Sequence, residues 1–355
     1  MEATKTEILN AGNAEELARV LPQAAALIRA GGLVAFPTET VYGLGADATD
    51  PSAVARIFAA KRRPTFDPLI VHIADRSDLP RVLAASALRD PRVSALADAF
   101  WPGPLTIVAP AAAEIPELVR AGLTSVGVRL PNHETARALI RAAGTPIAAP
   151  SANLFGQLSP TSAAHVLSQL NGIIDAILVA DSSRIGVESS VVSLLPGEPA
   201  RLLRPGGAPA EQIERVLAPF GPLEGPAKAV SPATALPAPG MTASHYAPRA
   251  RVRILDLDAP DLQGLSRVAL LAPENETLAR LSRATAGLTV VARAALSEEH
   301  DPVRAASRLF ELLHQLDEAF GVQREPRDTI LTTPYPEPGL GAAIADRLRR
   351  ASAER

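Results

Sequence analysis

The sequence contains no cysteine and few aromatic residues. None of its 355 residues is a cysteine, and Phe, Trp and Tyr together make up 3% of the chain. The absence of thiols excludes disulfide bonds, thiolate metal sites and a cysteine nucleophile. The six histidines show no HExxH-like spacing, so a structural zinc site is not expected. The scarcity of aromatic rings leaves few surfaces on which unpaired bases stack.

Long apolar runs and an excess of one charge are also absent. No stretch reaches the roughly 18 consecutive apolar residues that a transmembrane helix needs, and the N-terminus MEATKTEILN lacks the apolar segment of a signal peptide. We therefore expect a cytoplasmic protein without a membrane segment. The 35 basic and 38 acidic residues give a net charge of −3. That balance disfavours nonspecific coating of nucleic acid, although a local basic cleft is compatible with it.

The chain has enough apolar material for two globular domains. It is 47% hydrophobic and 21% charged, and its length exceeds the usual size of a single core. Apolar spacing predicts a helix over residues 14–30, and Asp50 followed by Pro51 marks the start of another. Several short apolar runs follow one another without an intervening helix, which favours a twisted mixed α/β sheet over a simple doubly wound one. The runs expected as strands are 33–37, 69–74, 105–110, 125–130, 145–150, 176–180 and 189–195.

A proline-rich stretch divides the sequence. Residues 219–249 are rich in proline and poor in large apolar side chains, which is typical of an extended linker. We therefore predict a catalytic domain over 1–218, a linker over 219–249 and a smaller domain over 250–355. In the last of these, apolar runs alternate with helical segments at 302–320 and 341–351, which favours a Rossmann-like α/β fold. It has no GxGxxG fingerprint after a strand, so dinucleotide binding there is not expected.

Three polar clusters follow or flank the predicted strands. The first, in GGLVAFPTETVYGLGAD, places Thr38 and neighbouring hydroxyls after a buried strand, where ligands of α/β proteins often bind. Its alternative is a plain turn in which hydroxyls cap the backbone and Gly43 and Gly45 supply positive φ. The second carries Lys61 and Arg63 at a helix end. Those two cations suit a triphosphate, but basic residues in a last turn also simply complement the helix dipole.

The third cluster, IAAPSANLFGQLSPTSAAHV, places Ser151 and Asn153 after an apolar run and Ser159 before a helix. Short hydroxyl and amide groups hold nucleotide phosphate or ribose without adding charge. The alternative is a turn followed by a helix cap, with Ser159 or Thr161 as the capping residue. No GxxxxGK[ST] loop is present, so a phosphate site in this chain must use side chains of this kind. Only the combination of the second and third clusters favours a ligand site.

Taken together, these clusters resemble the threonylcarbamoyl-AMP synthases of the YrdC and Sua type. The likeness rests on FPTETVYGLGADA, on the Lys-x-Arg pair followed by PLIVHI, and on FWPGPLTIV, VGVRLP, PSAN, GVESSVV and LLRPG. HYAPRA and PGLGAAIADRL extend it to the long, two-domain form of the family. Two positions depart from the usual pattern: Asp67 stands where asparagine is common, and Ser190 where threonine is usual.

The resemblance implies a role for particular residues. It assigns Lys61 and Arg63 to catalysis. The ATP-binding residues that it implies are Lys61, Arg63, Thr65, Ser151, Asn153, Ser159, Arg204, His245 and Tyr246. Those implied for threonine are Thr38, His72, Arg129, the Ala149 backbone and Ser189. It identifies no metal ligands, and Mg²⁺ is expected to be held mainly by the ATP phosphates.

The resemblance also implies a reaction and partners. ATP, L-threonine and bicarbonate or CO₂ would yield L-threonylcarbamoyladenylate and pyrophosphate. The product would pass to a threonylcarbamoyl-transferase complex that modifies the adenosine next to the tRNA anticodon. An alternative from another class is a noncatalytic module that binds a nucleotide or double-stranded RNA. A regulatory protein that senses nucleotide through its second domain is a third reading.

Overall fold

The computed structural model describes residues 5–225 and 236–354. Clustering of contacts divides them into two compact units. The first unit takes the chain up to Phe155, then Pro160–Arg184 and Glu188–Thr242, and the second takes Gly156–Ser159, Ile185–Val187 and the chain from Ala243 on. Two short segments that precede Ala243 in the sequence therefore belong to the second unit. Residues 226–235, inside the linker predicted over 219–249, lie outside the described residues.

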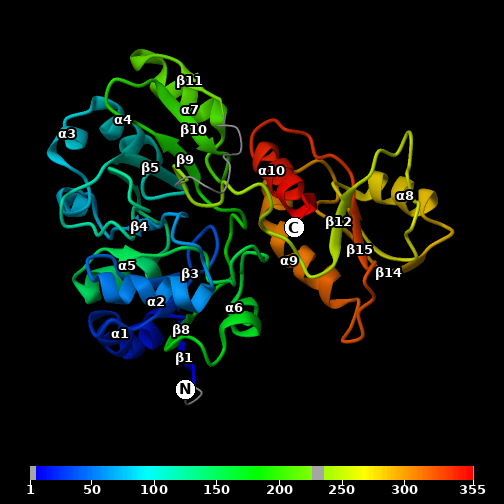
Figure 1. Ribbon diagram of the computed structural model, residues 1–355, viewed down its shortest axis with the longest axis horizontal. Coiled ribbons are helices and arrows are strands. Elements are labelled where there is room, and N and C mark those ends of the chain that lie inside the picture. Colours follow the sequence, from blue (N-terminus) through cyan, green and yellow to red (C-terminus); the bar gives the residue numbers. More distant parts are fainter. Residues whose placement is uncertain (1–4, 226–235, 355) are drawn as a thin grey trace. The chain divides into compact units, whose positions relative to one another are not determined.

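The first unit is built on a mixed sheet of 11 strands, in the order β1-β8-β2-β3-β7-β4-β6-β5-β9-β10-β11 (Figure 1). Neighbours β4 and β6 run parallel, whereas β5 and β6 run antiparallel. The predicted mixed sheet is thereby confirmed. The strands are β1 (Glu7–Asn10), β2 (Val34–Phe36), β3 (Gly43–Asp47), β4 (Ile70–His72), β5 (Leu105–Pro110), β6 (Ser125–Arg129), β7 (Ile147–Ala148), β8 (Ala176–Val179), β9 (Ser190–Ser193), β10 (Ala200–Arg204) and β11 (Leu223–Glu224).

Two apolar clusters cover opposite faces of this sheet. Along β2 the side chains alternate, so that Val34 and Phe36 join one cluster while Ala35 joins the other. The first cluster takes in helices α1 and α5, and the second takes in α2, α4 and α7. The helical elements of this unit are α1 (Ala14–Arg29), α2 (Pro51–Lys61), η1 (Arg76–Arg81), α3 (Ala85–Leu88), α4 (Pro91–Phe100), α5 (Glu134–Ala143), α6 (Ala163–Leu170), α7 (Ala210–Leu217) and η2 (Ala218–Phe220).

Helix α2 sets the position of the basic pair. It begins as predicted: the Asp50 carboxylate caps it by accepting from the Ser52 amide at 2.8 Å, and Pro51 occupies the first turn. Val54 and Ile57 are buried on one face. The helix ends after Lys61, at Arg62, which adopts a left-handed conformation with φ of 53°. That turn separates Lys61 from Arg63 and lets both side chains be buried while Arg62 stays exposed.

The sequence reading was wrong about the glycines at 43–47. The turn alternative requires a positive φ at Gly43 and Gly45, but this segment forms β3, and neither glycine has a positive φ. A Cβ added to Gly45 would lie 2.7 Å from Cε1 of Phe36 and 2.8 Å from Cγ2 of Ile147. Glycine is needed there because neighbouring side chains approach the strand closely, and not because of a turn.

The second unit carries a smaller, fully parallel sheet of four strands, in the order β12-β15-β13-β14. It confirms the Rossmann-like α/β fold that was predicted for the C-terminal part. Its buried apolar cluster includes Val268, Leu270 and Leu331. The elements are β12 (Arg251–Ile254), β13 (Arg267–Ala272), α8 (Asn275–Ala284), β14 (Thr289–Ala295), α9 (Pro302–Glu318), β15 (Thr329–Thr332) and α10 (Gly341–Ser352).

Candidate functional site

Lys61 lies against the segment that follows β7. Its Nζ donates to the carbonyl oxygen of Ser151 at 2.6 Å and to that of Asn153. Ser151 itself is bridged to Gly43 on β3, and the Asn153 side chain donates to the Leu154 carbonyl at 2.7 Å. Two of the predicted clusters, far apart in the sequence, therefore meet at one ammonium group.

Arg63 is tied to the loop that follows it. Its Nη2 lies 2.9 Å from Oδ1 of Asp67, and its guanidinium donates to the carbonyls of Asp67 and Pro68 at 3.0 and 2.8 Å. The guanidinium also lies over the ring of Phe155, 5.8 Å from its centroid. Thr65, in the same loop, is exposed. The loop thus fixes the Arg63 side chain by backbone contacts that leave Thr65 at the surface.

Asp67 is the negative centre of this cluster. It is fully buried, and burial raises its pKa above the ordinary value, against the opposing effect of Arg63, Lys61 and Arg204. Conversely, burial and the neighbouring Arg63 hold the pKa of Lys61 well below its usual range, while Asp67 acts in the opposite direction. Three basic side chains lie near one buried carboxylate, an arrangement that suits an anionic ligand whose charge would favour the protonated form of Lys61.

Arg204 connects this cluster to Ser189 and to the segment before residue 243. Its Nη2 donates to the Ser189 carbonyl at 2.9 Å and to the Ser189 hydroxyl at 3.3 Å, and its Nη1 donates to the Pro239 carbonyl at 3.1 Å. The Ser189 hydroxyl also shares a hydrogen bond with Thr106 on β5 at 2.8 Å. Thr106 is fully buried, and sequence reasoning missed it because it stands inside an apolar strand run.

Arg129, at the end of β6, is held by three different groups. Its Nε donates to the Gly103 carbonyl at 3.1 Å and its Nη1 to the Thr40 hydroxyl at 2.8 Å, while its Nη2 lies 2.7 Å from Oε1 of Glu39. Both charged residues are buried. Glu39 was not assigned a role from the sequence. Its place beside Thr38 in the first motif was the only signal that pointed to it.

His72 and Arg129 are paired residues on adjacent strands. They stand in register where β4 and β6 run parallel, so the side chains occupy one end of the sheet. Burial, reinforced by the Arg129 charge, lowers the pKa of His72 to about 3. The imidazole is therefore neutral at physiological pH and can donate or accept a hydrogen bond without carrying charge.

The Thr38 hydroxyl organises the turn between β2 and β3. It receives the amides of Thr40 and Val41 at 3.2 and 3.3 Å and donates to the Val41 carbonyl at 2.6 Å. It also shares a 2.8 Å hydrogen bond with the Thr40 hydroxyl, which links it to Arg129. The Thr38 hydroxyl therefore caps backbone groups of the turn, as the alternative interpretation of this segment predicts. At Ala149 the backbone amide donates to the Ile70 carbonyl at 2.9 Å.

Three of the predicted residues belong to the second unit. Ser159 contacts His314 of α9 through its carbonyl, at 3.3 Å from the imidazole Nε2. The rings of His245 and Tyr246 pack edge to face, with centroids 4.2 Å apart and an interplanar angle of 60°. Neither Ser159 nor Thr161 caps the following helix: Ser162 does so, accepting from the His165 amide at 3.3 Å. That alternative for Ser159 is therefore wrong.

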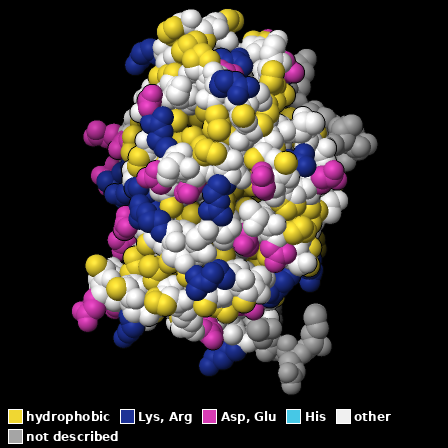
Figure 2. All heavy atoms as spheres, turned by 90° about the vertical axis from the view of Figure 1, so that its left-hand side faces the viewer, with side chains coloured by type: hydrophobic (Ala, Val, Ile, Leu, Met, Phe, Trp, Pro, Cys, Tyr) yellow, Lys and Arg dark blue, Asp and Glu magenta, His cyan; other side chains and the backbone are white. Residues whose placement is uncertain are grey.

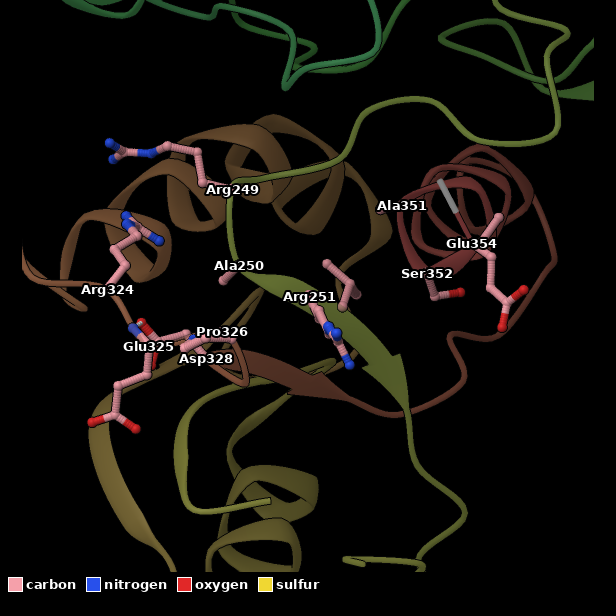
Figure 3. A pocket seen from close by; sticks show the side chains of 12 residues that line it. Arg249, Ala250, Arg251, Arg324, Glu325, Pro326, Asp328, Ala351, Ser352 and Glu354 are labelled. Atoms are coloured by element: carbon pink, nitrogen blue, oxygen red, sulfur yellow. Dashed lines mark hydrogen bonds between the residues drawn. The ribbon is translucent and has the colours of Figure 1, made fainter. Parts of the chain in front are cut away.

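The part of the chain that the structure describes also bears on the expectations for metal sites and membrane segments, and it contains a sizeable pocket. Across 5–225 and 236–354, no group of three or more His, Asp or Glu side chains is arranged to hold a metal ion. Within the same ranges, no helix has the length and apolarity that crossing a membrane requires. The second unit has a pocket of about 600 Å³ lined by Arg249, Arg251 and Arg324 (Figure 3). None of the predicted site residues lines it.

These features define the class of protein: a two-unit α/β protein whose larger unit gathers buried cations and short polar groups at strand ends. Comparison with known proteins agrees with this. Residues 26–206 match a family model described as Telomere recombination, and residues 208–353 match one described as Threonylcarbamoyl-AMP synthase, C-terminal domain. The chain belongs to the threonylcarbamoyl-AMP synthase family, in its two-domain form.

Individual relatives match over almost the full length. The chain is 42% identical to the threonylcarbamoyl-AMP synthase of Pyrococcus abyssi (strain GE5 / Orsay), covering 94% of both chains. It is 41% identical to that of Bacillus subtilis (strain 168), covering 94% of this chain and 93% of the other. It also resembles the crystal structure of P. abyssi Sua5 complexed with L-threonine, with a TM-score of 0.82, 38% identity and 98% coverage of both chains.

Proposed function

We propose that this chain is a nucleotidyltransferase that makes L-threonylcarbamoyladenylate from L-threonine, bicarbonate or CO₂, and ATP, releasing pyrophosphate. The product serves threonylcarbamoyladenosine modification of tRNA. The observation that carries the proposal is the convergence of Lys61, Arg63 and Arg204 around buried Asp67, with the Ser151 and Asn153 segment bound to Lys61. Family membership supplies the reaction, and this cluster supplies a place for its most highly charged substrate.

The chemistry requires positioning more than a nucleophile from the protein. The threonine amine, after losing a proton, adds to CO₂ to give a carbamate. A carbamate oxygen then attacks the α-phosphorus of ATP, and the bond to the departing pyrophosphate breaks. Because a carbamate is short-lived in water, the enzyme must hold the reactants in line and exclude solvent. The absence of any cysteine and the burial of the cationic cluster agree with this scheme.

Lys61 and Arg63 are proposed as the catalytic residues and, with Arg204, as the groups that balance charge moving onto pyrophosphate. All three now contact backbone carbonyls at 3.1 Å or less. ATP phosphate oxygens are stronger acceptors than carbonyls, so binding is expected to redirect these donors toward the nucleotide. Anionic phosphates would also favour the charged form of Lys61, whose pKa burial lowers in the free protein.

The remaining ATP-binding roles follow the family resemblance. Thr65, Ser151 and Asn153 would contact the nucleotide in the first unit. Ser159, His245 and Tyr246 are proposed on that resemblance alone, because they belong to the second unit.

Threonine is proposed to bind at the strand ends that carry Arg129 and His72. Arg129 would pair with the amino-acid carboxylate, and neutral His72 would offer a hydrogen bond without a competing charge. The other groups proposed for threonine are Thr38, the Ala149 backbone and Ser189. Hydrogen bonding of the threonine hydroxyl would reject analogues that lack it.

Mg²⁺ is proposed to enter with ATP. The described residues offer no metal-binding cluster of acidic or histidine side chains, so the phosphates would provide most of its ligands. Bicarbonate or CO₂ as the carbon source, a downstream transferase complex that acts on tRNA, and action in the cytoplasm also remain proposals. They rest on the resemblance and on the expected chemistry.

The alternative of a double-stranded RNA-binding module finds no support on the face seen in Figure 2. Lys and Arg side chains there are interspersed with Asp and Glu, without a continuous basic patch. RNA duplexes are bound largely through phosphate contacts, which need such a patch. The buried Lys61 and Arg63 suit a small ligand that enters a pocket better than a duplex that lies on a surface.

The experiment that tests the proposal measures pyrophosphate release by the purified full chain with ATP and Mg²⁺. Release must require both L-threonine and bicarbonate. Pyrophosphate formed without threonine, or nucleotide binding with no pyrophosphate when all substrates are present, contradicts the proposal. The second outcome would favour a regulatory nucleotide sensor.

A further inference from the structure

Tyr246 has a backbone conformation that is rare for its residue type. Its φ is 60°, in the left-handed region that large side chains avoid. Its side chain is almost fully buried, at 1% exposure. A strained, buried aromatic residue persists only when surrounding contacts fix it, and such residues gather at functional sites. Contacts from α9 and α10 fix Tyr246.

Helix α10 supplies the first set of contacts. The Arg347 guanidinium lies over the Tyr246 ring, 5.0 Å from its centroid, and is fully buried. Asp346 accepts from Arg347 Nη1 at 2.8 Å and from Arg350 Nε at 3.0 Å. The Arg350 carbonyl in turn accepts from the His245 amide at 3.2 Å. Three residues of α10 and the His245–Tyr246 pair thus form a closed circuit of contacts.

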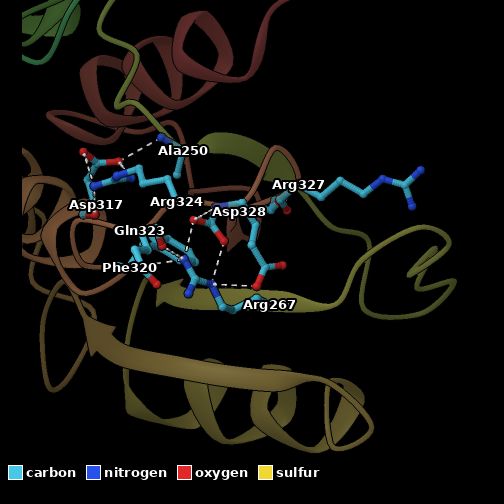
Figure 4. Close-up of polar contacts among 10 residues, drawn as sticks. Ala250, Arg267, Asp317, Phe320, Gln323, Arg324, Arg327 and Asp328 are labelled. Atoms are coloured by element: carbon cyan, nitrogen blue, oxygen red, sulfur yellow. Dashed lines mark hydrogen bonds and ion pairs between the residues drawn. The ribbon is translucent and has the colours of Figure 1, made fainter.

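Helix α9 secures the same segment at Tyr246 and further along. Phe310 packs against the Tyr246 ring with centroids 5.7 Å apart. Asp317 accepts from the Ala250 amide at 2.8 Å and from Arg324 Nη1 at 2.8 Å, as Figure 4 shows. The chain continues from Tyr246 through Arg249 and Ala250 into β12. Figure 3 shows Arg249 and Ser352 of α10 on opposite sides of the pocket. The segment from His245 to Ala250 is therefore held at both ends.

We propose that α9 and α10 form a rigid seat that fixes the position of His245 and Tyr246 for the adenylate-forming reaction, with Arg347 as the positioning residue. This inference rests on the proposed function, because it assumes that the pair takes part in nucleotide binding. It gives the C-terminal domain a task beyond connecting a linker. Arg347 acts through Tyr246 and is not itself expected to touch substrate.

Arginine suits this task better than lysine. Its guanidinium can lie over a phenol ring while an edge nitrogen donates to Asp346. A lysine ammonium has no flat face, and so would hold the ring less firmly. Asp346 neutralises the buried charge, which otherwise would be costly. Gly341, the first residue of α10, lets the helix begin close against the preceding loop, because an added Cβ there would lie 1.8 Å from the Pro336 carbonyl oxygen.

The test compares Arg347→Met and Arg347→Lys with Tyr246→Ala and the double variant Arg347→Met/Tyr246→Ala, all in the full chain. We expect Arg347→Met to raise the KM for ATP at least tenfold with a smaller effect on the KM for threonine, and Arg347→Lys to fall between it and wild type. The double variant should be no worse than Tyr246→Ala. Arg349→Met is the matched control, because Arg349 lies on the same helix, 59% exposed and paired with Glu337.

Hydrogen exchange supplies a readout that does not depend on activity. The amides of His245 and Tyr246 should exchange at least tenfold faster in Arg347→Met than in wild type or Arg349→Met, while amides of β13 keep their protection. A folded Arg347→Met with unchanged exchange and unchanged KM for ATP overturns the inference, as does an additive double variant. If Arg347→Met unfolds, the same criteria apply to Arg347→Lys. Faster exchange in a protein whose wild type makes no adenylate would refute the proposed function and not the seat.

Discussion

Nη2 of Arg129 lies 2.7 Å from Oε1 of Glu39, and both side chains are almost completely buried. A charge in the interior is tolerated only when it is paired, so Glu39 compensates the buried guanidinium at the end of β6. Thr40 and Gly103 occupy two further nitrogens of the same guanidinium. The orientation proposed for recognition of the amino-acid carboxylate is thus built into the protein.

Replacing Arg129 by Met should destabilise the protein by about 3–5 kcal/mol, because it leaves the Glu39 carboxylate buried without a partner. The free energy of unfolding in urea measures this. The double variant Arg129→Met/Glu39→Gln should recover part of the loss. The exposed pair Arg141–Glu134, at 46% and 73% side-chain exposure, is the control, and Arg141→Met should cost no more than about 1 kcal/mol. Equal effects at the two positions would show that the buried pair is not coupled as described.

Lys61→Ala should abolish the pyrophosphate release that depends on threonine and bicarbonate while leaving the protein folded. The reason is that the variant removes the ammonium group that joins the Ser151 and Asn153 segment to the cationic cluster. Circular dichroism and steady-state assays check the two parts. Arg62→Gly is the control, since Arg62 is the adjacent exposed residue with φ of 53°, a conformation that glycine adopts freely. Turnover at the wild-type rate by a folded Lys61→Ala protein would remove Lys61 from the site.

Serine should be a weak competing substrate. It keeps the hydroxyl that the site is proposed to bind and lacks only the methyl group, which allows discrimination of roughly 10- to 200-fold. Direct competition between the two amino acids, with both adenylate products quantified, gives the ratio of kcat/KM values. A ratio far above this range would mean that the methyl group is recognised by more than apolar contact.

The stability of the protein should depend on pH through His72. Its pKa is about 3 in the folded protein and about 6.5 when unfolded, so the unfolded state binds the extra proton first. Stability is therefore fully present above about pH 6.5 and falls as the pH drops toward 3, by up to about 1.4 kcal/mol per pH unit. Urea unfolding at about pH 7 and about pH 5 should show a smaller loss for His72→Gln than for wild type. Equal losses would mean that His72 is protonated in the folded state.

Much of the larger sheet followed from apolar runs bounded by proline or glycine. The run 105–110 became β5 with the same limits, and the run 125–130 became β6 with its end at Arg129. Strand β1 was missed because it has a single buried side chain, Leu9, and exposes Ile8 at 56%. Strand β3 was missed because its glycines look like turn residues. Gly43 and Gly45 are glycines because the Phe36 ring packs closely against them, and this contact forms only when β2 and β3 pair.

The sequence identified the residues of the candidate site, but it did not show which of them contact one another. Lys61, Arg63, Ser151 and Asn153 could be named from motifs. Lys61 donates to the backbone carbonyls of Ser151 and Asn153, which are 90 and 92 residues further along the chain and are brought close only by the pairing of strands. Asp67 was noted only as a departure from the family pattern, whereas it stands among three cations. Such roles depend on burial and on neighbours that are distant in the chain, which a linear pattern does not encode.

The most direct test of the account uses ¹³C-labelled bicarbonate with ATP, Mg²⁺, L-threonine and the purified chain, and detects products by mass spectrometry. The account predicts an adenylate that carries both threonine and a single labelled carbon, formed by wild type and absent from Lys61→Ala. An adenylate of threonine without the labelled carbon, or no adenylate at all from a folded wild-type protein with all substrates present, would contradict it.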